Sequence, residues 1–103
     1  MAREDIILSR NSDGKVTANV QHKWKAHSPD GFEWGYGGSG PADLALNILL
    51  KFGLSRERAW TLHQDFKWHF VAKVPKSGAT ISVAEIEAWL AQKEQEYSGP
   101  DIA

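Results

Sequence analysis

Cysteine is absent from this 103-residue chain. Its absence excludes disulfide bonds, thiol nucleophiles and thiolate metal ligands, so the stability of the fold rests on packing and hydrogen bonds. An excess of either charge is also lacking, because 12 basic residues stand against 13 acidic ones and the formal net charge is −1. No overall field directs the protein toward nucleic acid or an anionic membrane, and such binding needs a local cationic surface.

Long apolar runs are missing as well. No stretch approaches the roughly 18 apolar residues of a membrane-spanning helix, and Arg3, Glu4 and Asp5 stand where a signal peptide needs an apolar segment. We therefore expect a cytoplasmic protein. With 42% hydrophobic residues, residues 1–97 are expected to form a single globular domain, followed by a flexible tail over residues 98–103.

Two strands are predicted near the start of the chain, over residues 5–9 and residues 15 to about 26. The turn between them, Asn11-Ser12-Asp13-Gly14, suits a hairpin. In the second strand apolar and aromatic residues alternate with polar ones, which predicts an antiparallel sheet with one hydrated face. Residues 32–34 are expected to add a short third strand.

The first of three predicted helices has Gly40 as its N-cap and Pro41 at its first helical position. It is expected to run to Phe52 and to end at Gly53. Its polar residues recur every four positions: Asp43, Asn47 and Lys51. Because the other positions are almost all apolar, this helix is predicted to be the most buried element.

The second helix is predicted from a Ser55 cap to about Lys73, although residues 66–74 also alternate as a strand would. The third begins at a capping box, Ser82-Val83-Ala84-Glu85, and its later turns over residues 92–96 are expected to fray. These elements predict an α+β fold, in which an N-terminal antiparallel hairpin or small sheet packs against about three helices.

A glycine-rich loop joins the sheet to the first helix and is the main candidate site. Its residues 31–41 read GFEWGYGGSGP. The candidate binding residues are Trp34, Tyr36, Gly37, Gly38, Ser39 and Gly40. Such a loop can present backbone N–H groups to an anion, but the Lys-Ser/Thr pair of a phosphate loop is missing. We favour a structural role, with a glycine at positive φ beneath the aromatic rings, over an anion site or a protein-contact loop.

Basic residues interleaved with Trp60 and Trp68 on the second helix form a second candidate, a nucleic-acid face. They are Arg56, Arg58, Lys67, His69 and Lys73. A solvated basic face is the favoured interpretation, since most charge runs keep helices soluble.

Catalytic and metal-binding patterns are weak throughout. The four histidines, His22, His27, His63 and His69, include no pair at the spacing of a local metal site, and Ser39 lacks the nucleophile elbow because Pro41 replaces its last glycine. No catalytic residue, metal or cofactor is predicted, and an enzyme ranks third among the function classes.

Residues 32–45 read FEWGYGGSGPADLA. This run resembles the W-G-Y-x-G-S-G-P signature, preceding an apolar helix, of a family of small uncharacterised proteins found in bacteria and their phages. The resemblance implies an accessory protein of a phage or mobile element, with no activity to carry over.

Five tryptophans in so short a chain exceed what one small core hides, so some should stay exposed. The favoured function is therefore non-catalytic binding of a macromolecular partner, most simply another protein. Binding of nucleic acid or a phosphate ligand through the glycine-rich loop and the basic face is the alternative.

Overall fold

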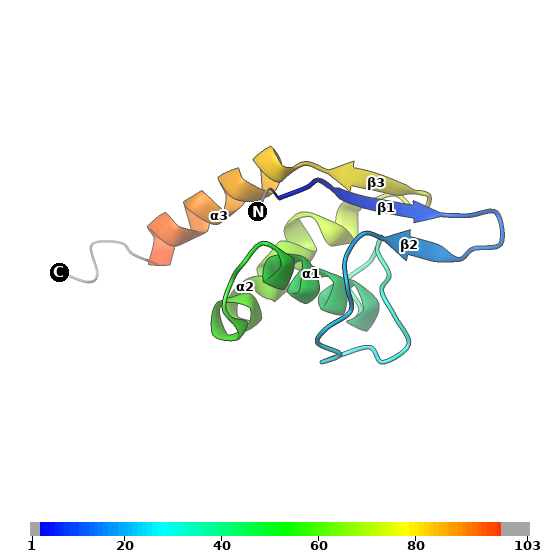
Figure 1. Cartoon of the computed structure of the whole chain (residues 1–103), viewed down its shortest axis with the longest axis horizontal. Helices are drawn as coiled ribbons and strands as arrows, with labels where there is room; N and C mark the ends of the chain where they lie inside the picture. Colours follow the sequence, from blue (N-terminus) through cyan, green and yellow to red (C-terminus); the bar gives the residue numbers. More distant parts are fainter. Residues whose placement is uncertain (1–2, 98–103) are drawn as a thin grey trace.

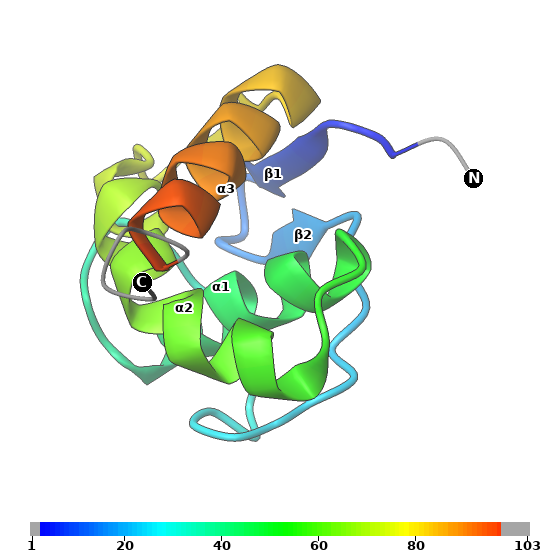
Figure 2. The same ribbon diagram turned by 90° about the vertical axis from the view of Figure 1, so that its left-hand side faces the viewer.

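The computed structural model describes residues 3–97, as three strands, three α-helices and one 3-10 turn. In chain order these are β1 (Ile6–Arg10), β2 (Val16–Ala18), α1 (Ser39–Lys51), α2 (Arg56–His69), η1 (Val71–Lys73), β3 (Gly78–Ile81) and α3 (Val83–Tyr97). Helices α1 and α2 lie side by side beneath the sheet, and α3 runs on from the end of β3 (Figures 1 and 2). The α+β prediction is confirmed, and the predicted tail over residues 98–103 lies outside the described residues.

The sheet is antiparallel, with the strand order β2-β1-β3. Ile6 and Leu8 of the central strand are buried, whereas Ile7 points to the opposite face and is exposed. This arrangement confirms the prediction that one face of the sheet is hydrated. The hairpin turn is also confirmed. Gly14 takes φ 83°, and the side-chain oxygen of Asn11 accepts the backbone N–H groups of Asp13 and Lys15.

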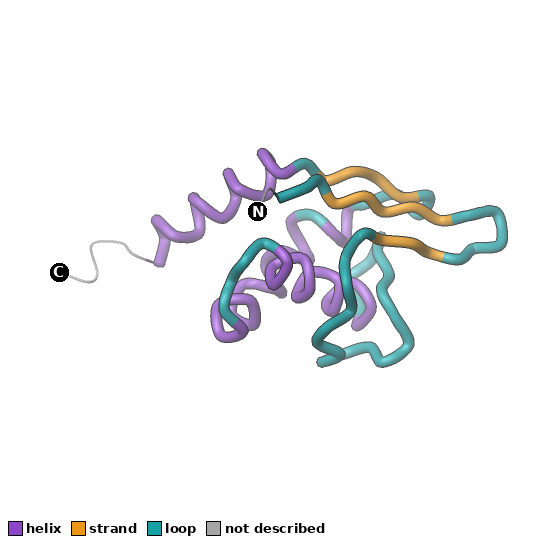
Figure 3. The backbone as a smooth tube through the Cα atoms, in the orientation of Figure 1, coloured by secondary structure: helices purple, strands orange, loops and turns teal. Residues whose placement is uncertain are grey.

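The second strand is much shorter than the predicted residues 15–26. Asn19 ends it, because its side-chain amide donates to the carbonyl of Asp5 and accepts the N–H of Ile7, replacing further ladder bonds. The chain then leaves the sheet in a long loop, residues 19–38, shown in teal between β2 and α1 in Figure 3. The alternation of burial continues along this loop, where Val20 is buried although no strand is present.

The predicted third strand at residues 32–34 is wrong. This segment is part of the long loop, with Phe32 packed on the ring of His22. The third strand is β3, whose four residues pair with β1 from the opposite side. Gly78 begins it at φ 113°, and the Cβ of any other residue there would collide with the backbone of Leu8.

Helix α1 begins two residues earlier than predicted, with Gly38 as its N-cap, so that Pro41 is its third residue. It ends at Lys51, and Gly53 follows at φ 92°. Residues 40–49 are all buried, which confirms the expected position of this helix at the centre of the core. Two of its polar residues are buried as well and shape the site described below.

The ends of the other helices follow their local sequence signals. Ser55 caps α2 by accepting the N–H of Arg58 at 3.1 Å, and residues 66–69 are helical, so the helical alternative was right for them. Ser82 and Glu85 form the predicted capping box of α3. The helix continues to Tyr97, and the fraying of its later turns stays a prediction. Within residues 3–97, no helix combines the length and apolarity needed to cross a membrane.

Candidate functional site

The polar residues of α1 hold the long loop in place. The side-chain oxygen of Asn47 accepts the N–H groups of Lys23 and Trp24 at 2.9 and 3.0 Å, and its amide donates to the carbonyl of Trp24. One turn earlier, the carboxylate of Asp43 accepts the N–H groups of His27 and Ser28. Both side chains are buried. These bonds fix residues 23–28 against the helix, where sequence analysis expected an ordinary polar stripe.

Four rings stack where this loop meets the first half of α2. The indole of Trp24 lies 5.5 Å from that of Trp60, between ring centroids, and the guanidinium carbon of Arg56 sits 3.9 Å above Trp24. The ring of His27 stacks on Trp60 at 5.4 Å and on His63 at 5.1 Å. A cation and four rings from two separate segments therefore form one continuous stack.

The glycine-rich loop packs against the other end of α2. The ammonium of Lys67 donates to the carbonyl of Gly37 at 2.9 Å and lies 4.5 Å from the ring centroid of Trp68. A Cβ on Gly37 would collide with the Trp68 ring, and one on Gly38 with the ring of Tyr36. Burial lowers the pKa of Lys67. This side chain therefore fixes the loop and is not part of a solvated basic face.

Positive φ was expected in this loop, and Gly31 (φ 132°) and Gly35 (φ 90°) adopt it. Gly37, Gly38 and Gly40 all have negative φ or extended backbone. They are required for close approach instead, as Gly40 shows, since its Cβ would lie 2.8 Å from the Cβ of Glu33. These close contacts favour the structural role of Gly37, Gly38 and Gly40, which stays a prediction.

The two loops flank one exposed stripe of α2. Trp60, Gln64 and Trp68 follow at intervals of four, so they lie on one side of the helix, and all three are exposed. Trp60 is 46% exposed and Trp68 57%. We call the surface formed by Trp24, Trp60, Gln64 and Trp68, with Arg56 at one end, the aromatic face. Tyr36, 52% exposed, lies on the loop beside it. The expectation that some tryptophans stay exposed is confirmed.

The remaining candidates of the glycine-rich loop do not join the aromatic face. Trp34 is buried in the core and its indole N–H donates to the carbonyl of Lys76. Ser39 is exposed at the start of α1, whereas Gly40 is buried. Arg10 lies over the ring of Trp34 and makes two hydrogen bonds to Glu33. These bonds hold the pKa of the Glu33 carboxyl below its ordinary value.

The five predicted nucleic-acid contacts are not on one surface. Arg56 and Lys67 belong to the side of α2 that carries the aromatic face. Arg58 is placed by the helical repeat on the opposite side, where it lines a groove beneath α3. His69 and Lys73 line a shallow hollow that they share with Trp68, at one end of the aromatic face, and with Trp89 of α3. Arg58 is thus separated from the other four cations, which adjoin the aromatic face at its two ends.

Sequence reasoning missed the histidine contacts. His22 donates from Nε2 to Asp43 at 3.0 Å, and Nε2 of His27 lies 3.0 Å from Nε2 of His63. These pairs are far apart in the sequence, so no local motif reveals them. Within the described residues, no group of three or more histidine, aspartate or glutamate side chains is arranged to hold a metal ion.

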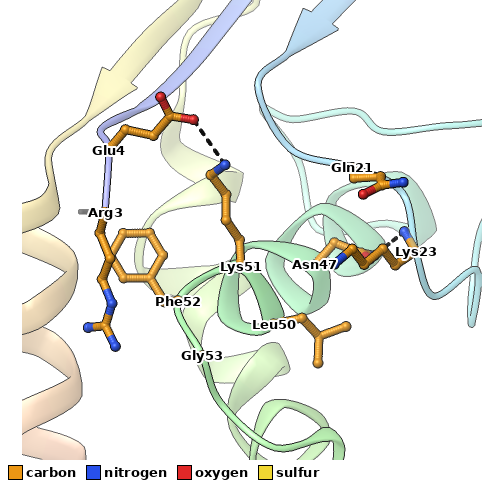
Figure 4. A pocket seen from close by; sticks show the side chains of 9 residues that line it. All are labelled: Arg3, Glu4, Gln21, Lys23, Asn47, Leu50, Lys51, Phe52 and Gly53. Atoms are coloured by element: carbon orange, nitrogen blue, oxygen red, sulfur yellow. Dashed lines mark hydrogen bonds and ion pairs between the residues drawn. The ribbon is translucent and has the colours of Figure 1, made fainter. Parts of the chain in front are cut away.

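A polar hollow lies at the C-terminal end of α1 (Figure 4). Lys51 pairs there with Glu4 at 3.0 Å, and Arg3 pairs with Glu87 of α3 at 3.0 Å. Two of its cations are therefore matched by carboxylates, and the exposed aromatic residues lie elsewhere. The aromatic face remains the stronger candidate site.

Fold and surface together define a small α+β protein with a preformed aromatic face. The chain belongs to a family of unknown function (DUF6166), whose model matches residues 3–92. Neither a curated protein nor a solved structure matches the chain.

Proposed function

We propose that the aromatic face binds another protein, and that the chain is a non-catalytic accessory protein of a phage or mobile element acting in the cytoplasm. The observation that carries the proposal is the exposure of Trp60 and Trp68 on one stripe of α2. Tryptophan, tyrosine and arginine are the residues in which binding energy concentrates at protein interfaces. The origin in a phage or mobile element is supported by the resemblance of the W-G-Y-x-G-S-G-P segment.

The rigidity of the surroundings supports the same function. Asn47 and Asp43 fix the loop that carries Trp24 and His27, and Lys67 fixes the loop beside Trp68. A surface whose neighbours are already ordered loses little conformational entropy when a partner binds. The exposed indoles are therefore prepared for contact, which a purely structural role for them would not require.

Charge favours a protein over nucleic acid. Binding of single strands combines stacking with several cations along the backbone path. On the aromatic face Arg56 is already stacked on Trp24, and the ammonium of Lys67 is bonded to a carbonyl. Arg58 lies on the opposite side of α2, and His69 and Lys73 adjoin the face only at its Trp68 end. Nucleic-acid or phosphate binding stays the alternative.

Affinity capture from host lysate with three baits tests the proposal. The baits are the wild-type chain, the double variant Trp60→Ala/Trp68→Ala, and Ile7→Thr as a matched control, because Ile7 is equally exposed on the far face of the sheet. We expect nuclease-treated lysate to yield a protein retained by wild type and by Ile7→Thr but lost by the double variant.

The purified partner then provides the quantitative measurement. Each single tryptophan variant should weaken its affinity at least about tenfold, as for residues at the centre of an interface. Thermal melting shows whether each variant remains folded. Capture that depends on intact nucleic acid would support the alternative, and capture that is indifferent to both tryptophans would reject the aromatic face as the binding surface.

A further inference from the structure

The direct contact between His27 and His63 fixes where the protons of both rings lie. Nδ1 of His63 is 2.6 Å from the carbonyl oxygen of Trp60, and a carbonyl only accepts, so Nδ1 carries the hydrogen. The Nε2 of neutral His63 is then an acceptor. Because Nε2 of His27 lies 3.0 Å away, His27 must donate from that nitrogen.

This arrangement accepts one added proton without breaking the contact. His27 can bind a proton at Nδ1, which makes no hydrogen bond within residues 3–97, while its Nε2–H continues to donate to His63. A second proton has only Nε2 of His63 to occupy. Two N–H groups and two positive rings would then face each other across 3.0 Å, and the contact cannot persist. Gln64, whose amide lies 3.3 Å from the same nitrogen, would lose its acceptor too.

The surroundings of His63 oppose its protonation. Burial is the largest cause that lowers the pKa of its ring, and the positive charges of His27 in the loop and Lys67 on α2 act in the same direction. The hydrogen bond to the carbonyl of Trp60 favours the charged form, and so does the negative charge of Asp43 on α1. Its carboxylate, however, already accepts two backbone N–H groups and His22.

We propose that the His27–His63 pair makes the aromatic face proton-sensitive: the contact is kept while the pair holds at most one added proton, and the second proton separates the rings. Separation removes His27 from its stack on Trp60 and so changes the surface offered to a partner. The consequence for partner binding rests on the proposed function, but the titration of the pair does not.

The free full-length protein provides the primary test. Histidine ring signals in NMR and tryptophan fluorescence are followed from pH 8 to pH 4.5, with circular dichroism showing that the fold persists. We expect two steps of proton uptake by the pair, at least about one pH unit apart, with a change in indole emission at the second. A single common step for both rings, with unchanged emission, would overturn the inference.

Two matched variants locate the effect. His63→Gln keeps an acceptor oxygen near the position of Nε2 but cannot be protonated, so the second step and its emission change should vanish. His69→Gln makes the same substitution in the same helix outside the pair and should keep both. If His63→Gln retained the emission change, Trp60 would be responding to another group and the proposal would be wrong.

Partner binding is measured on either side of the second step. When the pH is lowered through the second step, the affinity of the wild-type protein should fall at least tenfold. The affinity of His63→Gln should change by less than threefold over the same pH range. Partner binding that depends on both tryptophans but not on pH would reject the proton-sensitive face and leave the proposed function standing. Binding that is indifferent to both tryptophans would reject the proposed function, while the titration of the free protein still decides the behaviour of the pair.

Discussion

Truncating Asn47 to alanine tests whether α1 organises the aromatic face through hydrogen bonds. The substitution leaves the N–H groups of Lys23 and Trp24 and the carbonyl of Trp24 without their partner. Each such loss costs about 1 kcal/mol where water replaces the bond and up to about 3 kcal/mol where it cannot. With the loop at the surface and Asn47 itself 2% exposed, we expect a total loss of about 3 kcal/mol.

Urea unfolding measures this loss of free energy directly. In calorimetry it corresponds to a melting temperature lower by roughly 12–24 °C for a domain of this size. The near-ultraviolet circular dichroism of the Trp24–Trp60 stack should weaken as well, because Asn47 holds the backbone of Trp24. Lys51→Ala is the matched control from the same helix stripe. Lys51 is exposed and, among residues 3–97, forms its ion pair with Glu4, so its loss should cost less than about 1 kcal/mol. Equal costs for the two variants would refute the reasoning.

Three further outcomes follow from the geometry. Leu49→Ala should cost about 2–5 kcal/mol in urea unfolding, because Leu49 is fully buried in α1, and a loss under half a kcal/mol would contradict its place in the core. Gly78→Ala should lower the free energy of unfolding by more than about 3 kcal/mol, since its Cβ would meet the backbone of Leu8. Gly14→Ala is the control, because Gly14 has positive φ but open space around it, and it should cost only about 1 kcal/mol. Similar costs for the two variants would contradict the close approach of Gly78 to Leu8. Burial lowers the pKa of His63 below 6.5, so the unfolded chain binds a proton on this ring more tightly than the folded protein does. The free energy of unfolding should therefore fall as the pH drops below about 6.5 toward the pKa of the folded state. Unfolding at several pH values measures this dependence, and His63→Gln should reduce it.

The features that were predicted from the sequence are set by neighbouring residues. A hairpin turn needs only residues such as Asn11 and Gly14, and a capping box needs only Ser82 and Glu85, three positions apart. The apolar composition of residues 42–50 similarly predicts a buried helix without any knowledge of its partners. These parts of the fold follow from local chemistry.

The features that were missed depend on contacts distant in the sequence. β3 is four residues long and becomes a strand because β1 lies beside it. Asp43 and Asn47 look like an exposed stripe until the loop is known to cross them. The one available signal was the alternation through Val20, His22 and Trp24, which correctly indicated burial but was interpreted as a strand. The glycine-rich loop was likewise identified, whereas its contact with Trp68 depended on the arrangement of α2.

The position of β1 in the middle of the sheet has a consequence for synthesis. Ile6 pairs with Ile81, so the second neighbour of this early strand is made only after both α1 and α2 have been synthesised. Until then one edge of β1 is unpaired, and an unpaired edge can associate with other chains. A ribosome-bound chain that stops before Gly78 lacks the strand that covers this edge. The release of β3 from the ribosome is therefore the step that allows this edge of β1 to be covered.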